Sequence, residues 1–278
     1  MPHPEPPRGG VRTITSLQNE RVKLIRSLEM RKARRETGLF VAEGASVLVT
    51  AREAGWAPRM LVFLAGSAQA GVARGLLAWA EAAGAECLEV SQGVLAKLAA
   101  KDNPQTMLGV FEQRWIPEPA PTGVADDAVW VALEGVRDPG NLGTIIRTAD
   151  AVGASGVALV GTSCDPYSRE AVRASMGSIF NVALVRMSQE RFLAWAAAWK
   201  GDVVGTHLSG TEDYRAVRYR VPTLLAMGSE GPGLSPELAA ACSRLVKIPM
   251  AGRLDSLNLA VATALMLYEI RKGRLHLA

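Results

Sequence analysis

Residues 129–161 read VWVALEGVRDPGNLGTIIRTADAVGASGVALVG, and this stretch decides the fold. The apolar runs at 129–135 and 156–161 have the length and the β-branched content of buried strands. Between them, 141–153 has the apolar spacing of a helix, which ends at Gly153. Because neighbouring parallel strands need such a crossover, the stretch predicts a βαβ unit in a parallel sheet that is covered on both faces.

The same alternation of strands and helices continues to the end of the chain. Further strands are predicted at 181–187, 202–208, 223–231 (running into a loop) and 244–250, and helices at 168–178, 191–200, 235–242 and 256–272. This pattern is typical of an α/β domain.

The first part of the chain alternates in the same way on a smaller scale. Residues 12–115 predict a small α/β unit that begins with one amphipathic helix from Ser16 to Glu36. Three prolines and a glycine then exclude regular structure, which predicts a linker at 116–124. Residues 125–278 form the second expected domain.

The composition indicates a folded protein outside the membrane. The chain has 278 residues, of which 49% are hydrophobic and 21% charged, as expected for a globular protein with a real core. The apolar stretch 257–270 is shorter than the roughly 20 residues of a membrane span and contains Asn258 and Glu269. The first ten residues lack the apolar run of a signal peptide. We therefore expect a cytoplasmic protein without membrane contact.

Cysteine and histidine usage predicts no metal site and no disulfide framework. The three cysteines lie far apart without a CxxC pair, and none of the three histidines has metal-ligand spacing. Each cysteine is interpreted as a small buried apolar residue.

The positive charge is concentrated near the N-terminus. The formal net charge is +4, and residues 1–40 hold nine Lys and Arg against four Glu. Such an excess is expected of an arm or helix that contacts phosphates, although a solvated helix face has the same composition.

Three glycine-bearing loops follow strands in the second half, at 134–143, 228–233 and 248–256. Ligands of open α/β sheets bind beyond the carboxyl ends of the strands, and glycine allows close approach of the backbone. No GxGxxG opens a helix after a strand, and no P-loop is present, so a dinucleotide fits poorly. The loops predict a nucleotide-like ligand held by backbone groups.

Five polar residues stand in or beside these loops: Asn141, Arg147, Glu230, Ser256 and Asn258. Each also has a structural explanation, because Asn141 or Ser256 could cap a helix, Arg147 could lie on a solvated face and Glu230 could sit in a turn. Asn258 differs, since it enters an otherwise apolar helix. Burial of an unpartnered amide would cost about 1–3 kcal/mol, so we expect a defined hydrogen-bond role for it.

Three segments of the chain resemble the sequence motifs of the SpoU/TrmH family of RNA ribose 2′-O-methyltransferases, in the SPOUT superfamily. They are LEGVRDPGNLGTIIRTADAVGASGV (133–157), LLAMGSEGPGLS (224–235) and IPMAGRLDSLNLAVATALMLYE (248–269). VRASMGSIFNVALV (172–185) is also similar to the family. ITSLQNERVKLIRSL (14–28) and GLFVAEGASVLVTAREAG (38–55) resemble the N-terminal substrate-binding domain of such enzymes, which is similar to ribosomal RNA-binding proteins.

The resemblance implies a fold, a cofactor and an assembly. It implies a C-terminal parallel-sheet domain with a trefoil knot, which pattern reasoning alone would reject because connections almost never knot. It also implies S-adenosylmethionine as cofactor and a homodimer with each site near the subunit interface. At matching positions, the cofactor contacts would be Gly228, Ile248 and Leu257, with Thr206 as a further candidate.

The resemblance also assigns roles in methyl transfer to a ribose 2′-hydroxyl. Arg147 matches the catalytic arginine, and because free arginine has a pKa above 12, we expect it to bind a phosphate and stabilise the developing alkoxide rather than act as a base. Asn141 would shape its loop and help to hold Arg147, and Glu230 would orient Arg147 or the ribose. Ser256 and Asn258 would organise the third loop.

Large-subunit (23S) rRNA is the preferred substrate, by analogy with relatives that carry a similar N-terminal domain. The alternatives are a tRNA methyltransferase, a non-catalytic RNA-binding scaffold of the same fold, and a nicotinamide oxidoreductase. The intact polar residues argue against the scaffold, and the missing dinucleotide fingerprint argues against the oxidoreductase.

Overall fold

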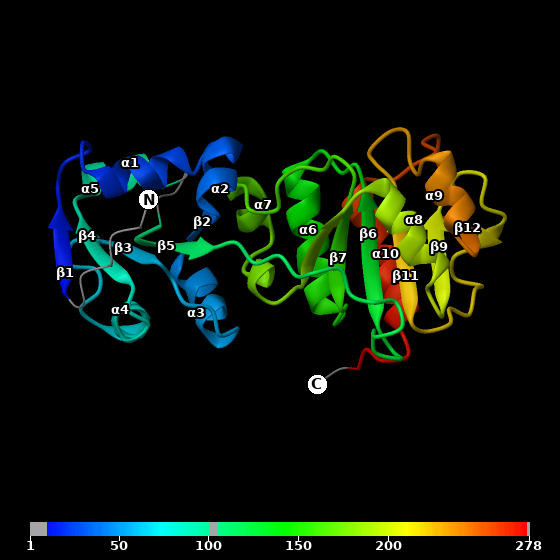
Figure 1. Ribbon diagram of the computed structural model, residues 1–278, viewed down its shortest axis with the longest axis horizontal. Helices are drawn as coiled ribbons and strands as arrows, with labels where there is room; N and C mark the ends of the chain where they lie inside the picture. Colours follow the sequence, from blue (N-terminus) through cyan, green and yellow to red (C-terminus); the bar gives the residue numbers. More distant parts are fainter. Residues whose placement is uncertain (1–9, 100–104, 277–278) are drawn as a thin grey trace. The chain divides into compact units, whose positions relative to one another are not determined.

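The computed structural model describes residues 10–99 and 105–276, which form two compact units (Figure 1). The first unit contains the chain up to Gln113 together with Tyr167–Phe180. The second contains Arg114–Pro166 and the chain from Asn181 onward. The chain therefore returns once to the first unit after the second has begun.

The first unit is built on a five-stranded mixed sheet with strand order β1-β4-β3-β5-β2. Its elements are β1 (Val11–Ile14), α1 (Glu20–Ser27), α2 (Arg31–Thr37), β2 (Leu39–Glu43), α3 (Ala45–Glu53), β3 (Met60–Leu64), α4 (Gly71–Ala82), β4 (Glu86–Val90), α5 (Gln92–Leu98) and β5 (Met107–Glu112). Helices α1 and α5 pack together on one face of the sheet, and α3 and α4 on the other (Figure 1). Strand β5 runs in the direction opposite to the other four strands of this sheet.

The single helix expected from Ser16 to Glu36 is wrong, because the chain forms two helices here. Met30 has extended backbone angles and separates α1 from α2. The Arg34 side chain, only 4% exposed, donates to the carbonyls of Leu28 (2.7 Å) and Glu29 (2.8 Å). A buried guanidinium thus satisfies carbonyls that a continuous helix would have satisfied.

Residues 167–180, which we expected in the second domain, pack in the first unit. They form α7 (Arg169–Ala174) and a 3-10 helix (Ser178–Phe180), and α7 lies against β2. The ring centroids of Tyr167 and Phe40 lie 4.7 Å apart with the rings tilted, and those of Phe180 and Phe111 lie 4.9 Å apart. The indole of Trp56 donates to the Phe180 carbonyl at 2.8 Å. The aromatic cluster of the first unit is therefore completed by a segment distant in sequence.

The second unit is built on a seven-stranded sheet, parallel throughout, with strand order β10-β12-β9-β11-β6-β7-β8. Its elements are β6 (Val129–Glu134), α6 (Pro139–Ala151), β7 (Gly156–Val160), β8 (Leu184–Met187), α8 (Gln189–Ala197), β9 (Asp202–Thr206), β10 (Glu212–Asp213), β11 (Thr223–Met227), α9 (Pro236–Ala241), β12 (Arg244–Lys247) and α10 (Leu259–Arg271). This confirms the predicted α/β fold with a parallel sheet. The trefoil knot stays a prediction.

Helices cover both faces of this sheet, as the continuous apolar strands predicted. Helices α8 and α9 pack together on one face, where Trp195 fills a core with Trp130 and Phe192. Helices α6 and α10 pack against each other, and α10 also contacts β11. Strand residues whose side chains point to the opposite face of the sheet from Trp130, such as Val131, are equally buried. The central strands β6, β7 and β11 are therefore buried on both faces, whereas β10 and β12 at one side of the sheet are partly exposed.

The predicted linker lies along the second unit without regular structure. The Ile116 amide donates to the Leu184 carbonyl of edge strand β8 at 2.9 Å. Glu118 pairs with Arg191 at 2.8 Å, and Trp195 donates to the Pro119 carbonyl. The segment is thus fixed by its contacts rather than by helix or strand pairing.

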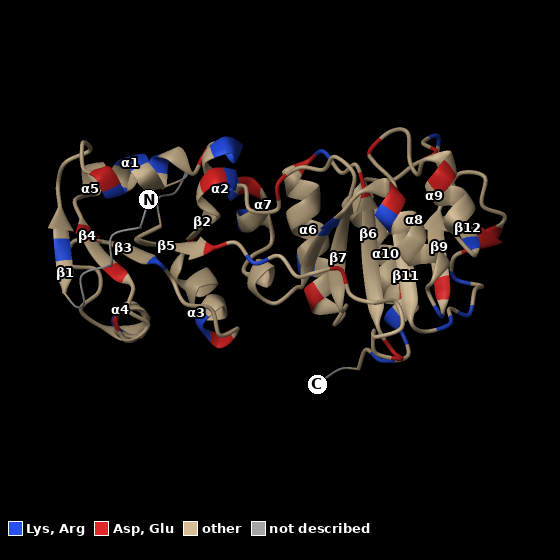
Figure 2. Ribbon diagram, in the orientation of Figure 1, with Lys and Arg blue, Asp and Glu red and all other residues tan. Residues whose placement is uncertain are grey.

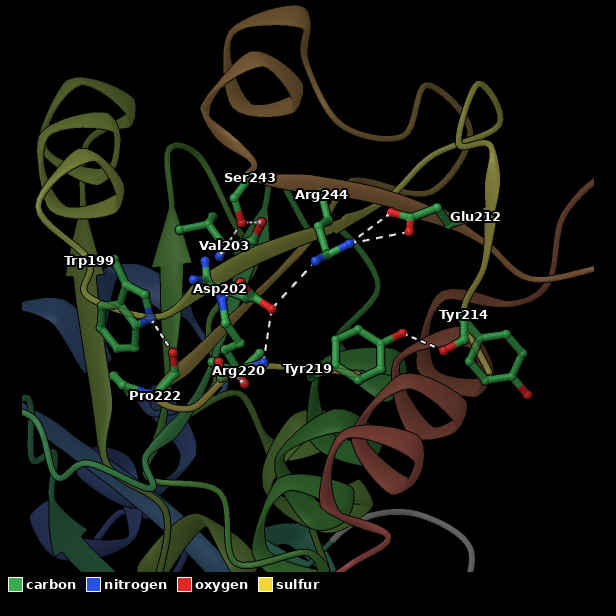
Figure 3. A network of polar contacts seen from close by, with 11 residues as sticks. Trp199, Asp202, Val203, Glu212, Tyr214, Tyr219, Arg220, Pro222, Ser243 and Arg244 are labelled. Atoms are coloured by element: carbon green, nitrogen blue, oxygen red, sulfur yellow. Dashed lines mark hydrogen bonds and ion pairs between the residues drawn. The ribbon is translucent and has the colours of Figure 1, made fainter. Parts of the chain in front are cut away.

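A network of polar contacts fixes the amino ends of β9 and β12 (Figure 3). Asp202 is buried and accepts from the Arg220 side chain at 2.8 Å and from its amide at 2.9 Å. Arg244 lies 3.6 Å from Asp202 and 3.2 Å from Glu212. Because these groups satisfy one another, the network anchors the segment between β9 and β11.

No helix within residues 10–99 and 105–276 is long and apolar enough to cross a membrane. Within the same described ranges, no group of three or more His, Cys, Asp and Glu side chains could hold a metal ion.

Candidate active site

The three glycine-bearing loops predicted from the sequence lie at one edge of the parallel sheet. They follow β6, β11 and β12, and with β9 these strands are consecutive neighbours in the order β12-β9-β11-β6. All of them run in the same direction, so their carboxyl ends share an edge. This is where ligands of open α/β sheets bind.

A chain of hydrogen bonds connects the three loops. The Asn141 side-chain amide donates to Glu230 Oε1 at 3.0 Å, and the Asn258 amide donates to Asn141 Oδ1 at 2.9 Å. The other carboxylate oxygen of Glu230 accepts from the Arg137 amide at 3.2 Å. Three of the five polar residues singled out from the sequence therefore contact one another, although 117 positions separate Asn141 from Asn258.

The helix caps at the site differ from the structural alternatives considered above. Asp138, not Asn141, caps α6, and its side chain accepts a hydrogen bond of 2.6 Å from the backbone N–H of Asn141. Asn258, not Ser256, caps α10, so the helix begins at Leu259 rather than at residue 256. Its Oδ1 accepts from Ala260 N at 2.9 Å and Val261 N at 3.3 Å. The expected hydrogen-bond role of Asn258 is confirmed, but the residue is exposed rather than buried.

Glu230 is held as a carboxylate. Its partial burial would raise its pKa, but the hydrogen bonds from Asn141 and from neighbouring backbone amides outweigh burial and lower the pKa below its ordinary value. The Cys164 thiol nearby behaves in the opposite way, because burial and the charge of Glu230 raise its pKa to about 12. That thiol stays protonated at neutral pH and is no nucleophile.

Gly228 begins a loop that folds back on itself. The Ser229 amide and carbonyl exchange hydrogen bonds of 3.1 Å with Gly233. A Cβ atom at position 228 would lie 1.9 Å from the Gly233 carbonyl carbon and 2.0 Å from the Leu234 nitrogen. Both are backbone atoms, so only glycine fits at this position.

Arg147 lies two turns into α6, six residues after Asn141, and is exposed. Its side chain makes no hydrogen bond or ion pair with another residue that the structure describes, while Asn141 and Glu230 contact each other. The expected roles of these two residues toward Arg147 stay predictions. Ser256 is likewise exposed in the third loop.

The expected cofactor residues lie at the ends of the same strands. Thr206 ends β9, and its hydroxyl lies 3.4 Å from the Met227 sulfur at the end of β11. Ile248 directly follows β12, and Leu257 directly precedes the Asn258 cap. In the described part of the chain, the backbone C=O groups of residues 248–257, and their N–H groups apart from Pro249, which has none, make no hydrogen bond to another backbone group.

One residue at this edge was missed by sequence reasoning. Glu134 is the last residue of β6, and its side chain accepts a hydrogen bond of 2.8 Å from the backbone N–H of Ser235. This bond connects the end of the second loop to β6. A carboxylate that follows five apolar strand residues, directly before Gly135, is a signal that could have been noticed.

Comparison with known proteins shows the family to which this chain belongs. The model of the SpoU rRNA methylase family matches residues 128–268, which include the loops described above. The chain belongs to the SpoU rRNA methylase family. A second model, the MRM3-like substrate binding domain, matches residues 19–109.

Relatives of this SpoU chain match it over nearly its full length. A crystal structure of AdoMet-bound rRNA methyltransferase from Sinorhizobium meliloti has 45% identity, covers 96% of this chain and 100% of that chain, and has a TM-score of 0.87. The 23S rRNA (uridine(2479)-2′-O)-methyltransferase of Streptomyces viridochromogenes is 33% identical over 88% of this chain and 86% of its own. The 23S rRNA (guanosine(2553)-2′-O)-methyltransferase of Bacillus subtilis is 28% identical, and the match spans 94% of this chain and 100% of that protein.

Proposed function

We propose that the protein transfers a methyl group from S-adenosylmethionine to a ribose 2′-hydroxyl of large-subunit (23S) rRNA. The observation that carries this proposal is the hydrogen-bonded chain Glu230–Asn141–Asn258, which brings the three family motifs together at the ligand-binding edge of the sheet. Two relatives named for 23S rRNA ribose methylation and an AdoMet-bound relative support it. A ribosomal RNA substrate would also place the protein in the cytoplasm.

The site has the chemistry that this cofactor needs. S-adenosylmethionine lacks phosphates and requires no cationic cradle, whereas its adenine, ribose and amino-acid groups need polar partners. The unpaired backbone groups of residues 248–257 supply such partners beside Ile248 and Leu257, while the tight turn at Gly228 and the Thr206 hydroxyl border the same edge. When bound, the cofactor supplies a methyl group already activated on sulfur.

The remaining catalytic task belongs to the protein, which must position the ribose and stabilise its 2′-oxygen as the proton leaves. Arg147 is the cation for this task, since it is exposed on α6, the helix that follows the first loop, and other described residues do not neutralise it. It would bind the phosphate of the target nucleotide and the developing alkoxide. Asn141, Glu230 and Asn258 position the loops, and Ser256 completes the third loop.

We infer that the protein is a homodimer through the methyltransferase domain. Val261, Leu265 and Tyr268 of α10 are 49%, 37% and 52% exposed, and their spacing places them on one face of the helix. An exposed apolar stripe beside a polar site is typical of a protein interface. The Asn258 cap at the start of α10 would bring that interface close to the site.

Methyl transfer is tested with tritiated S-adenosylmethionine and total rRNA or total tRNA from a strain lacking this gene. We expect label in large-subunit rRNA, recovered as a 2′-O-methyl nucleotide whose position is then mapped. Label only in tRNA would show that the substrate is tRNA rather than rRNA, while the proposed methyl transfer would stand. No label in either RNA, with the cofactor bound, would favour the non-catalytic scaffold.

The dimer is tested with Leu265→Glu in sedimentation velocity. The added charge should convert the dimer to a monomer and reduce methyl transfer. Leu208→Glu is the matched control, because Leu208 is also exposed but lies outside α10. A monomeric wild-type protein with full activity would contradict the inference.

A further inference from the structure

The first unit contains a large pocket that the proposed catalytic site does not use. Its volume is about 1230 Å³, and it is bounded by α1, the beginning of α3, the end of α5, and α7. Pockets for drug-sized ligands have roughly 300–1,000 Å³, so this one has room for a nucleotide and its flanking phosphates.

The rim of the pocket is cationic. Arg26 from α1, Lys97 from α5 and Arg173 from α7 line it and are exposed. Within the described ranges, none of these three side chains has a hydrogen bond or an ion pair. Figure 2 shows the basic residues of α1 and α2 on the ribbon.

The other charged side chains of the lining are mostly paired. Arg169 binds the carboxylates of Glu29 (2.8 Å) and Glu43, and donates to the Leu98 carbonyl at 2.5 Å. Lys23 pairs with Glu20 at 2.9 Å. Glu170 is the remaining carboxylate of the lining. The cations that stay available therefore outnumber the carboxylates, which fits a phosphate chain.

The pocket also has an apolar part that includes Val41, Val47, Val172 and Met176. Met176 has a φ of +51°. In the described part of the chain, every other non-glycine residue has a negative φ. This conformation is unfavourable for a methionine, yet it leaves the side chain 56% exposed at the pocket. A polarisable thioether in this position suits contact with an aromatic ring.

We propose that this pocket binds an unpaired nucleotide of the RNA substrate. The base would lie against Met176 and the valines, and the flanking phosphates against Arg26, Lys97 and Arg173. Sequence-specific proteins recognise single-stranded RNA through splayed bases and phosphates in this manner. The proposal rests on the proposed function, because it names how that RNA is held away from the reacting ribose.

Three of the proposed contacts, Val172, Arg173 and Met176, come from residues 167–180 and not from the N-terminal sequence. Arg173 and Met176 lie in this segment, which the aromatic pair Tyr167 and Phe180 fixes in the first unit. The pocket is therefore incomplete without a segment that lies between family motifs of the methyltransferase sequence.

The experiment measures binding of the full-length protein to a fluorescein-labelled oligouridine by fluorescence anisotropy. Arg173→Glu should weaken binding about tenfold. The slope of log affinity against log salt concentration should become less steep by about 0.7 for each phosphate that the variant no longer binds. Met176→Ala should weaken binding about two- to tenfold without changing the salt dependence, because it removes an uncharged group. Both residues are exposed, so folding should be retained and is checked by thermal melting.

Matched controls are available in the same unit. Arg74 is exposed on α4, on the opposite face of the sheet, and Met30 is exposed between α1 and α2. Arg74→Glu and Met30→Ala should leave affinity unchanged. Losses as large as those of the pocket variants would overturn the proposal, because binding would then be non-specific. Equal effects of Met176→Ala on oligouridine and on a duplex of the same length would also overturn it.

Methylation assays separate this proposal from the proposed function. Arg173→Glu should raise the KM for RNA and leave kcat and cofactor affinity unchanged. Normal methylation with unchanged RNA affinity in both pocket variants would refute the pocket alone. Absence of methylation by the wild-type protein would refute the proposed function, while the oligouridine measurements would still decide whether the pocket binds RNA.

Discussion

Arg147 is the residue whose side chain the proposed chemistry requires most directly. Arg147→Ala should lower methyl transfer by at least about 100-fold and leave cofactor binding within about twofold, because the loops that would hold the cofactor do not depend on this side chain. Rates with tritiated cofactor and calorimetric affinities measure both effects. Arg147→Lys should keep part of the activity, since it keeps the charge. Loss of cofactor binding in Arg147→Ala would assign a structural role instead.

A second prediction at the scale of single residues concerns Glu230 and pH. Its pKa is lowered in the folded protein, so its contribution to stability is present above its ordinary pKa and is lost as the pH falls through the lowered value. Glu230→Gln should cost at most about 1 kcal/mol at pH 7, because water partly screens the group. The difference in unfolding free energy between wild type and variant, measured with urea, should shrink on acidification.

Glu81→Gln is the control variant for this measurement, because Glu81 is exposed on α4 and lies in the first unit, away from the proposed site. A difference between wild type and Glu230→Gln that stays constant with pH would contradict the assignment.

Side-chain types at the site could be predicted from the sequence, but not their partners. The polar residues next to glycine loops pointed to Asn141, Glu230 and Asn258 from the sequence alone. Which residue caps each helix could not be predicted. Asp138 and Asn141 both stand at the start of α6, and Ser256 and Asn258 both stand at the start of α10, and all four residues are of types that make good N-caps. Those choices depend on hydrogen bonds across 117 positions of sequence.

At the scale of elements, the turn after β11 depends on Gly228. Gly228→Ala should destabilise the protein by about 1–3 kcal/mol and abolish cofactor binding, because the added methyl group meets backbone atoms of Gly233 and Leu234 at about 2 Å. Gly252→Ala in the third loop is the control, since a methyl group added there would meet no atom within 4 Å and the φ of Gly252 is ordinary. Thermal unfolding and cofactor titration of the two variants should therefore differ. Normal cofactor affinity in Gly228→Ala would show that the turn is dispensable.

Element prediction succeeded where periodicity and glycine agreed, and failed where a tertiary contact decided. The strand–helix–strand unit at 129–161 was predicted because its two strands are continuous apolar runs and because Gly153 stands just after the end of its helix. The division between α1 and α2 depends on Arg34, whose buried guanidinium binds carbonyls at the end of α1. No local pattern distinguishes this arginine from the exposed Arg35 beside it. Strand β1 was missed because three of its four residues are exposed.

At the scale of the whole molecule, a core residue of the first unit lies after β6 and β7 of the second unit in the chain. Phe180→Ala should destabilise the first unit by about 3–5 kcal/mol, because Phe180 packs between Trp56 and Phe111. Hydrogen exchange should accelerate in β2 and β5. Phe192→Ala removes a core aromatic ring of the second unit and should accelerate exchange there instead. Faster exchange confined to the second unit in Phe180→Ala would refute the assignment of this segment.

The return of residues 167–180 to the first unit sets an order of events during protein synthesis. Ribosomes add about 5–20 residues per second, so several seconds pass between the emergence of β5 and that of Phe180. During this interval Phe40, Trp56 and Phe111 lack two of their aromatic neighbours and present apolar surface. A nascent chain paused before Tyr167 should therefore be bound by chaperones at its N-terminal part, and release should follow once Phe180 has left the exit tunnel.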